Sequence, residues 1–339
     1  MTSEHRPPSE LVEQARSAEK AGHSAKALGL FDDALSALGE GSADPYIADV
    51  LRWKGTLLRE RGETEGAFRC YTRSLEHARL SGSIGAEAHA LNCQAIIFQR
   101  RGENKEAERH YAEAAALAET VGDARLLGMI QQNRGVLANM HGDFGAATEL
   151  YSKSLDAFEK AGDAEPLSWV LNNMGMLHTK TGDFGEARIC FARALEIARQ
   201  RGDTIVQSVV SLNLAEAWVG AGRLDLADVL CAQALEEAQR RDDHLTAAGA
   251  LKVRASIERR RGALDKSIAT LRIAIYEAEG AEDRLLHAEM LRELGEISRA
   301  VGNSGAARSA LREAADAFKL TGATRDFQDV EAQLRSLPS

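Results

Sequence analysis

The sequence contains few aromatic residues, prolines or cysteines, and no long apolar run. Aromatic residues make up 5% of the 339 positions, whereas 44% of the positions are hydrophobic. Small residues such as alanine must therefore supply much of the core, which suits helices that approach one another closely. Only five prolines are present, and proline disrupts helix interiors. These shortages favour an all-helical protein.

The absence of long apolar runs argues against a membrane protein. No stretch reaches the roughly 18 uninterrupted apolar residues of a spanning helix. The first ten residues, MTSEHRPPSE, lack the apolar segment of a signal peptide. The four cysteines, Cys70, Cys93, Cys190 and Cys231, lack CxxC spacing and are interpreted as free thiols in a reducing compartment. We therefore expect a cytoplasmic protein that does not contact a membrane.

Charge and motifs also exclude several functions. The formal charge of −9 at pH 7 opposes nucleic-acid binding, which needs a positive field. The sequence has no GxxxxGK[ST], HExxH or GxSxG motif. His89 and Cys93 lie four residues apart, but two ligands do not make a metal site. We expect no enzymatic activity, no catalytic residues, no cofactor and no metal.

Glycine recurs at a fixed interval of 40 residues. The positions are Gly22, Gly62, Gly102, Gly142, Gly182, Gly222, Gly262 and Gly302. A second series lies half a period later, at Gly82, Gly122, Gly162, Gly202 and Gly322, with Asp242 and Glu282 in its two gaps. A fixed internal period is typical of stacked supersecondary units, so these residues are interpreted as turns.

Apolar residues keep constant spacings from each glycine of the first series. The fifth position after it is Ala, or Ser267 in one repeat. The ninth position is an aromatic residue, Leu or Cys, and the twelfth is Ala or Ser. Seven positions before it stands Ala or Gly, and eleven positions before it Leu in six of eight repeats. These offsets share helix faces, so each glycine joins two amphipathic helices. Aspartates, among them Asp143, Asp163, Asp183 and Asp203, are expected to cap these helices.

This pattern resembles the tetratricopeptide repeat. That family has a small residue in the first helix, a Gly-Asp turn, and then Ala, an aromatic residue and Ala along the second helix. The best match is LNNMGMLHTKTGDFGEARICFARALEIA, residues 171–198. The period of 40, rather than about 34, is similar to the long repeats of kinesin light chains and of the spindle-orientation protein Pins.

The resemblance covers residues 8–336 and implies a fold and a division of the chain. The implied fold is all-α, a right-handed α-solenoid of eight helical hairpins followed by a C-terminal capping helix. The implied segments are a disordered tail at residues 1–7, the repeats at residues 8–322, and the capping helix and tail at residues 323–339. A cap is expected because solenoids need one at an open end.

In such a solenoid the first helix of each hairpin lines the concave groove. Groove-facing positions lie 13, 10, 9, 6, 3 and 2 residues before each turn glycine. Amides gather at two of these offsets, in Asn92, Gln132, Asn133, Asn172, Asn173 and Asn213. Amides donate and accept hydrogen bonds, so they can hold an extended peptide backbone. In the families that this chain resembles, asparagines nine residues before the glycine have this role, which transfers to Asn133, Asn173 and Asn213. Alternatively, these asparagines bond along the helix layer and stabilise the superhelix.

Apolar and basic residues complete the expected groove. Met129, Trp169 and Met176 occupy groove-facing offsets, where Met-rich surfaces adapt to varied partners. The alternative is that they belong to the core. Basic residues lie in repeat two and in repeats seven and eight, at Arg52, Lys54, Arg59, Lys252, Arg254, Arg259, Arg260 and Arg292. They form a solvated face or hold an acidic or C-terminal carboxylate partner; among them, Arg254 and Arg292 are predicted peptide contacts.

The sequence thus predicts a non-enzymatic scaffold or adaptor that binds a peptide or protein segment in a concave groove. Two alternatives are an intracellular peptide-sensing regulatory protein and a self-assembling homo-oligomeric scaffold. Repeat one begins near residue 8, so no N-terminal effector domain is expected, which disfavours the sensor. The Ala-, Arg- and Gly-rich composition suggests a bacterial source.

Overall fold

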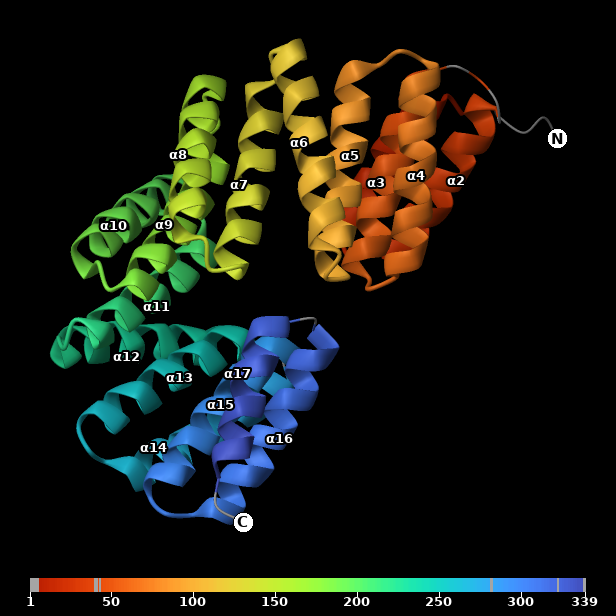
Figure 1. The fold of residues 1–339 in the computed structure, drawn as a ribbon. Helices are drawn as coiled ribbons and strands as arrows, with labels where there is room; N and C mark the ends of the chain where they lie inside the picture. The colour runs from red at the N-terminus through yellow and green to blue at the C-terminus, as the bar shows by residue number, and fades with distance from the viewer. Residues whose placement is uncertain (1–5, 40–41, 43, 281–282, 322, 338–339) are drawn as a thin grey trace. The chain divides into compact units, whose positions relative to one another are not determined.

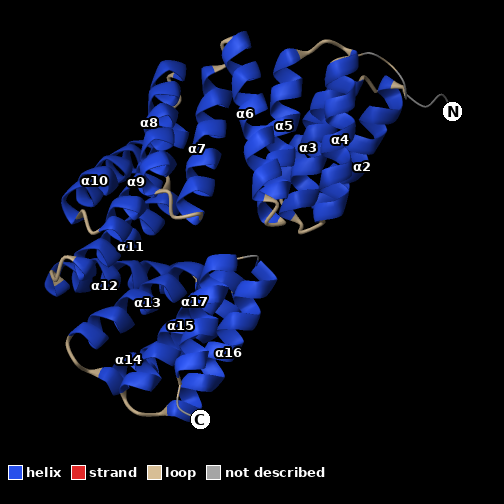
Figure 2. Ribbon diagram, viewed as in Figure 1, coloured by secondary structure: helices blue, strands red, loops and turns tan. Residues whose placement is uncertain are grey.

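The computed structural model describes residues 6–39, 42, 44–280, 283–321 and 323–337. Within these ranges all regular structure is helical and no strand is present, which confirms the all-α fold class (Figures 1 and 2). The first five residues of the predicted tail lie outside the described residues, as do Glu282 and Gly322 of the second turn series.

The chain divides into two compact units, residues 1–137 and residues 138–339. Unit 1 holds α1 (Pro8–Lys20), α2 (Ser24–Leu38), α3 (Tyr46–Glu60), α4 (Thr64–Leu80), α5 (Ile84–Arg100), α6 (Asn104–Val121) and most of α7 (Ala124–Met140). Unit 2 holds α8 (Phe144–Ala161), α9 (Ala164–Thr181), α10 (Phe184–Arg201), α11 (Thr204–Gly220), α12 (Leu224–Arg241), α13 (His244–Arg260), α14 (Leu264–Gly280), α15 (Arg284–Ala300), α16 (Ser304–Thr321) and α17 (Thr324–Ser336). The eight-repeat division at residues 8–322 stays a prediction.

Within each unit, successive helices pack as antiparallel hairpins. In unit 1, α1 packs on α2, α3 on α4 and α5 on α6; in unit 2, α9 packs on α10, α11 on α12, α13 on α14 and α15 on α16 (Figure 1). We call the odd-numbered helices A helices and the even-numbered ones B helices. Neighbouring A helices also contact one another, α3 with α5 in unit 1 and α9, α11, α13 and α15 in succession in unit 2. Helix α17 packs against α16.

The residues predicted to face the core are buried. The position five residues after the turn glycine is 0% exposed in all eight repeats, from Ala27 to Ala307. Phe31, Tyr71, Tyr111 and Phe191, nine residues after their glycines, are also completely buried. Because alanine adds little bulk, the B helix lies close to its A partner, and an aromatic ring fills the remaining space in the first five hairpins, where Cys231, Leu271 and Leu311 do so in the last three. The helical faces predicted from the sequence are confirmed.

The turns and caps also match the predicted pattern. Gly182 ends α9 with a φ of 84°, a left-handed conformation that glycine adopts without a steric penalty. Asp242 occupies the gap in the second series and is the one described non-glycine residue with positive φ, 54°. Asp183 accepts a hydrogen bond from the Glu186 amide at the start of α10, and the other predicted capping aspartates do the same at their helices. Caps of this kind satisfy amides that a helix start leaves unpaired.

The small residue in the middle of each A helix permits the closest contact in the hairpin. A Cβ added to Gly175 of α9 would lie 2.6 Å from the Phe191 ring of α10, which is far too close. Gly55 meets Tyr71 in the same way, at 2.7 Å, and Gly295 meets Leu311 at 2.6 Å. The A helix therefore presents its bare backbone to the large side chain of its B helix.

We expect Gly175→Ala to lower the free energy of unfolding by about 1–3 kcal/mol, because the new methyl group must displace the Phe191 ring. Gly29→Ala is the matched control, since Gly29 is exposed in α2 with no neighbour within 4 Å. It should stabilise the protein by up to about 1 kcal/mol through helix propensity alone. Urea denaturation of both variants measures the difference. Equal stabilisation by both changes would show that the hairpin tolerates a wider separation.

Candidate peptide-binding surface

Each A helix packs against B helices on one side and presents another side to solvent. In α9 this free face carries Trp169, Asn173 and Met176, which lie 13, 9 and 6 residues before Gly182. Met176 is 46% exposed, and Trp169 and Asn173 are partly exposed. Trp169 also packs against the core of the α9–α10 hairpin. It is therefore partly a surface residue and partly a core residue, the two alternatives that the sequence left open. We call this side of the odd-numbered helices the A-helix face.

In unit 1 the predicted amides lie at the seam between α5 and α7. Asn133 Nδ2 donates to Asn92 Oδ1 at 3.2 Å, and Asn92 is only 2% exposed. Gln132 is partly exposed and has no hydrogen-bond partner among the described residues. Met129 lies nearby on α7 and is 37% exposed. Asn133 therefore joins α7 to α5, whereas the amide of Gln132 is available to a ligand.

The same arrangement recurs in unit 2 between α9 and α11. Asn213 Nδ2 donates to Asn172 Oδ1 at 2.8 Å, and Asn172 Nδ2 donates to Met176 Sδ at 3.6 Å. Asn172 is 3% exposed, so its bonds satisfy an amide that burial would otherwise leave unpaired. Asn173 is partly exposed, and no described residue bonds to its amide. It is the one predicted amide of unit 2 that is free to bind a ligand.

Four of the six predicted amides bond to one another in two pairs, and the other two, Gln132 and Asn173, have no partner among the described residues. Asn92 and Asn172, ten residues before their glycines, are buried between A helices and have the structural role that the sequence analysis kept as an alternative. Asn133 and Asn213 each use one N–H group to bond to them. Peptide binding by the exposed amides stays a prediction, strongest for Asn173.

Farther along unit 2, the A-helix face carries a cluster of charged side chains. Lys252 Nζ of α13 lies 3.2 Å from Glu216 Oε1 of α11 and 2.7 Å from Glu289 Oε2 of α15. Burial alone would lower the pKa of the Lys252 ammonium, but these two carboxylates outweigh it and raise that pKa. Glu293 accepts a hydrogen bond from Ser256 Oγ at 2.9 Å, and burial raises the pKa of its carboxyl group.

Arg259 and Arg292 are also paired with carboxylates. Arg259 Nη1 lies 3.4 Å from Glu296 Oε2, and Arg292 Nη1 lies 2.5 Å from Asp326 Oδ1 of α17. These residues surround an open pocket of about 340 Å³ that Lys252, Arg259, Glu289, Arg292, Glu293, Glu296, Asp329 and Gln333 line. Carboxylates outnumber cations there. The basic side chains that the sequence analysis assigned to this end therefore lie in an acidic setting.

Arg254 has a different environment from Arg292. It lies beside Cys231 of α12, and its positive charge lowers the pKa of that thiol against the larger, opposite effect of burial. Arg134 occupies the same position three repeats earlier and likewise bonds to the preceding B helix, through Glu108. A position eight residues before the turn glycine thus faces a B helix. Peptide contact by Arg254 and Arg292 stays a prediction.

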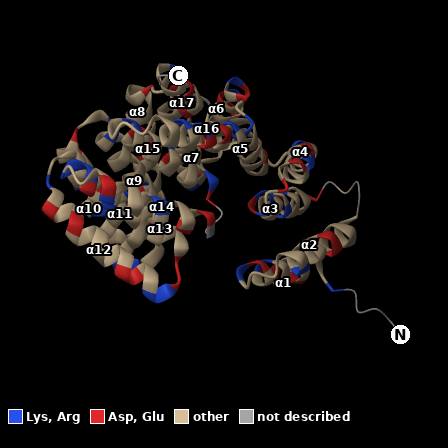
Figure 3. Cartoon of the chain, turned by 90° about the horizontal axis from the view of Figure 1, so that it is seen from below, with Lys and Arg blue, Asp and Glu red and all other residues tan. Residues whose placement is uncertain are grey.

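The carboxylates of this cluster are not among the site residues predicted from the sequence. Glu216 and Glu296 lie six residues before their glycines, and Glu293 lies nine residues before Gly302. These are groove-facing offsets, as is the position of Arg292 ten residues before Gly302, so the rule that fits Arg292 also fits the glutamates. Figure 3 shows acidic and basic residues interspersed along the helices of each unit rather than gathered by sign.

Neither a membrane-spanning helix nor a metal site occurs among the described residues. No helix among them is long and apolar enough to cross a membrane. No group of three or more His, Cys, Asp or Glu side chains in the described ranges could hold a metal ion.

Comparison with known proteins defines the class of the chain as a helical repeat protein of the solenoid type. Residues 86–160 and 146–200 match the family model of the tetratricopeptide repeat. The same 40-residue pattern continues on both sides of these matches. Residues 86–200 are therefore tetratricopeptide repeats. A search of curated protein sequences finds no significant match.

Solved structures with this fold include a quorum sensor, RapI and a Rap protein. The apo quorum sensor NprR from B. thuringiensis superimposes with a TM-score of 0.70 at 15% identity, over 92% of this chain and 87% of NprR. Apo RapI gives a TM-score of 0.64 at 15% identity, over 81% of this chain and 98% of RapI. A Rap protein complexed with Competence and Sporulation Factor gives 0.60 at 14% identity, over 97% of each chain. At such identities these likenesses show the fold.

The asparagine seam generates a stability prediction. We expect Asn213→Ala to lower the free energy of unfolding by about 1–3 kcal/mol, because it leaves the buried Asn172 carbonyl without its donor. Asn173→Ala should change stability little, since no described residue bonds to that side chain. Thermal or urea unfolding of the two variants provides the test. A larger loss in Asn173→Ala than in Asn213→Ala would contradict this assignment of roles.

The charged cluster generates a pH-dependent prediction. Lys252→Met should cost about 3 kcal/mol at pH 7, because it leaves Glu216, Glu289 and Glu293 close together without their cation. The cost should shrink as the pH falls, because burial raises the pKa of the Glu293 carboxyl group and its protonation in the folded variant removes part of the repulsion. Urea unfolding at several pH values measures it.

Lys153→Met is the matched control for this substitution. Lys153 forms an ion pair with Glu149 at 2.6 Å, but both side chains are exposed, at 56% and 67%. Exposed pairs contribute little to stability, so this variant should unfold like the wild type at every pH. A pH-independent cost for Lys252→Met would mean that the lysine contributes by packing and not by charge.

Proposed function

We propose that this chain is a non-enzymatic scaffold that binds an extended peptide or protein segment on its A-helix face. The observation that carries the proposal is the free face of α9, where the unpaired amide of Asn173 adjoins Met176, a large side chain that is 46% exposed. Amides recognise a peptide backbone whatever its sequence, and an exposed thioether adapts to varied apolar side chains. Together they suit a ligand that is held by both its backbone and its side chains.

The charge of the surface adds a preference for one kind of ligand. The pocket around Lys252 and Glu293 contains more carboxylates than cations, and burial already disfavours charge on Glu293. A ligand amino group or a Lys or Arg side chain would offset this excess of negative charge. We therefore propose that a segment bound to unit 2 carries a positive charge near α13 and α15.

A second candidate function is the sensing of a signalling peptide. The fold likeness to the quorum sensor NprR and to a Rap protein complexed with Competence and Sporulation Factor favours it. Both candidate functions use the same surface, and they differ in whether peptide binding changes an output. The free thiols and the composition support the proposal that the protein works in the cytoplasm of a bacterium.

Selection from a display library of random peptides tests the proposed surface. Peptides enriched on the wild type should lose at least tenfold in affinity for Asn173→Ala, measured by fluorescence anisotropy, because the variant lacks the amide that bonds to their backbone. Gln200→Ala is the control, since Gln200 is an exposed amide on the B helix α10 that bonds to Glu196 of its own helix. It should bind the peptides like the wild type.

Three results would argue against the proposal. The first is a library that yields no enriched peptide. The second is equal binding by Asn173→Ala and the wild type. The third is a molar mass that rises with concentration in light scattering, with peptides unable to reverse it, which would favour the self-assembling scaffold.

A further inference from the structure

The sixth hairpin, α11 and α12, departs from the repeat at the positions where its two helices should pack. Eleven residues before the turn glycine, six repeats have Leu and the fourth has Gln131, and all seven are buried. The sixth repeat has Ser211, which is partly exposed. Three residues earlier, repeats two to five, seven and eight bury a small residue, whereas Ser208 of α11 is partly exposed. The interior of this hairpin is thus open where the others are closed.

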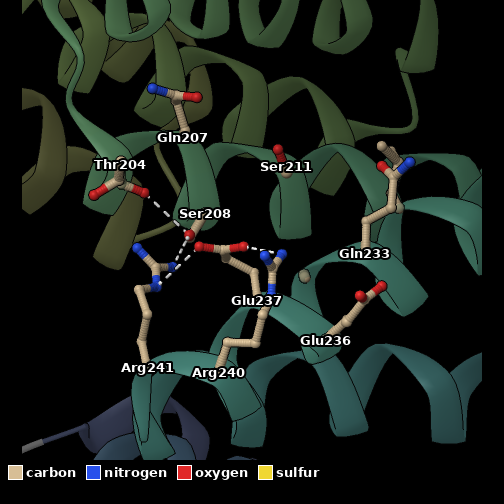
Figure 4. Close-up of a pocket in the computed structure, with 11 residues that line it drawn as sticks. Thr204, Gln207, Ser208, Ser211, Gln233, Glu236, Glu237, Arg240 and Arg241 are labelled. Carbon is tan, nitrogen blue, oxygen red and sulfur yellow. Dashed lines mark hydrogen bonds and ion pairs between the residues drawn. The ribbon is translucent and has the colours of Figure 1, made fainter.

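The opening forms a pocket of about 330 Å³ between the first half of α11 and the second half of α12 (Figure 4). Both helices belong to unit 2. Leu230 and Ala234 of α12 supply apolar surface, and the other lining side chains are polar or charged. Residues 204, 207, 208 and 211 of α11 line this pocket, whereas Asn213 faces the seam with α9. The pocket therefore lies on a different side of α11 from the proposed peptide contacts.

One end of the pocket is held by a charged network. Arg241 Nη2 donates to Ser208 Oγ at 3.0 Å, and its Nε lies 3.5 Å from Glu237 Oε1. Arg240 also pairs with Glu237, and Ser208 Oγ donates to the Thr204 carbonyl at 3.0 Å. A guanidinium group has five N–H donors, so each arginine keeps donors that these contacts do not use. This end is prepared for an anionic group.

The opposite end offers groups of the other kind. Figure 4 shows Arg241 at the left of the pocket, Glu236 and Gln233 at the right, and Ser211 above the gap between them. Among the described residues, none bonds to the side chains of Ser211, Gln233 or Glu236. A carboxylate, an amide carbonyl and a hydroxyl are the acceptors that an ammonium group needs, since it has three donors and no acceptor.

The composition of the pocket limits the class of its ligand. Two glutamates and two arginines give it no net formal charge, and none of the lining residues is aromatic. A nucleotide would find no ring to stack on and would meet two carboxylates. The volume is at the lower end of the range for ligand pockets, about 300–1,000 Å³, which suits a small molecule. A small molecule with one positive and one negative end matches the two ends of the pocket.

We propose that the α11–α12 pocket binds a free α-amino acid. Its carboxylate accepts hydrogen bonds from Arg240 and Arg241, and its ammonium group donates to Glu236, Gln233 and Ser211. The side chain of the amino acid lies toward Leu230 and Ala234 or toward the open mouth. This site does not depend on the proposed binding of peptides to the A-helix face.

The test uses each of the twenty L-amino acids as a probe of the full chain. At least one should raise the melting temperature of the wild type, because a ligand that binds only the folded state stabilises it. Titration calorimetry with the active amino acid should give one site per chain. Its N-acetyl derivative and its methyl ester should each bind at least tenfold more weakly, because each derivative lacks one of the two charges.

Two variants locate the site. Ser211→Leu restores the residue of the other repeats, fills the pocket and should abolish binding. Gln131→Leu makes the same kind of change at the same repeat position in α7 and should leave binding intact. Glu236→Gln removes the charge that receives the ammonium group without breaking any described contact, and it should weaken binding at least tenfold even if Ser211→Leu folds poorly.

The proposal is overturned if none of the twenty amino acids binds at millimolar concentration. It is also overturned if a bound amino acid has the same affinity for folded Ser211→Leu or for Glu236→Gln as for the wild type. Equal affinity of the N-acetyl derivative or the methyl ester would show that the pocket does not recognise a zwitterion, and would likewise refute it.

Discussion

The close approach of each A helix to its B helix, which an alanine or a glycine in the middle of the A helix permits, is the constraint on which each hairpin depends. At Gly175 and Phe191 there is no room for even one added methyl group. Such a close approach fixes which side of the A helix is covered and which side remains free. The turn glycines, the aspartate caps and the seams between A helices all follow from that orientation. The position of the candidate surface is thus set by packing that lies on the opposite side of the same helices.

Polar groups that this packing buries are paired with one another across the seams. Asn172 is satisfied by Asn213, Asn92 by Asn133, and Lys252 by carboxylates from the A helices on both sides. Each of these contacts joins helices roughly 40 residues apart in sequence, so it links one repeat to the next rather than the two halves of a hairpin. The apolar contacts build the hairpins, and the polar contacts set how neighbouring A helices align within a unit.

The fold was predictable because a strict period converts sequence spacing directly into helix faces. The burial of Ala27 and Phe31, the turn at Gly182 and the cap at Asp183 all follow from spacing and local chemistry. The role of Asn172 did not follow from spacing, because its position lies at the border between the free face and the seam. At this border, neighbouring positions such as 172 and 173 differ in burial. The acidic setting of Arg292 was missed because charge was assessed one sign at a time. Ser211 was visible as one of two departures from leucine, yet only the structure shows that it leaves a space while Gln131 does not.

The regular spacing of the repeats bears on how the pocket in the α11–α12 hairpin could have arisen. Every repeat follows the same 40-residue spacing, so a position in one has a defined counterpart in the others. The sixth hairpin differs from its neighbours by a few side chains in a frame that is otherwise unchanged. A protein built in this way can acquire a new cavity by a point change in one module, while the remaining modules keep the chain folded. The repeats together keep the chain folded, and each repeat is also a position at which a new binding site can evolve without changing the others.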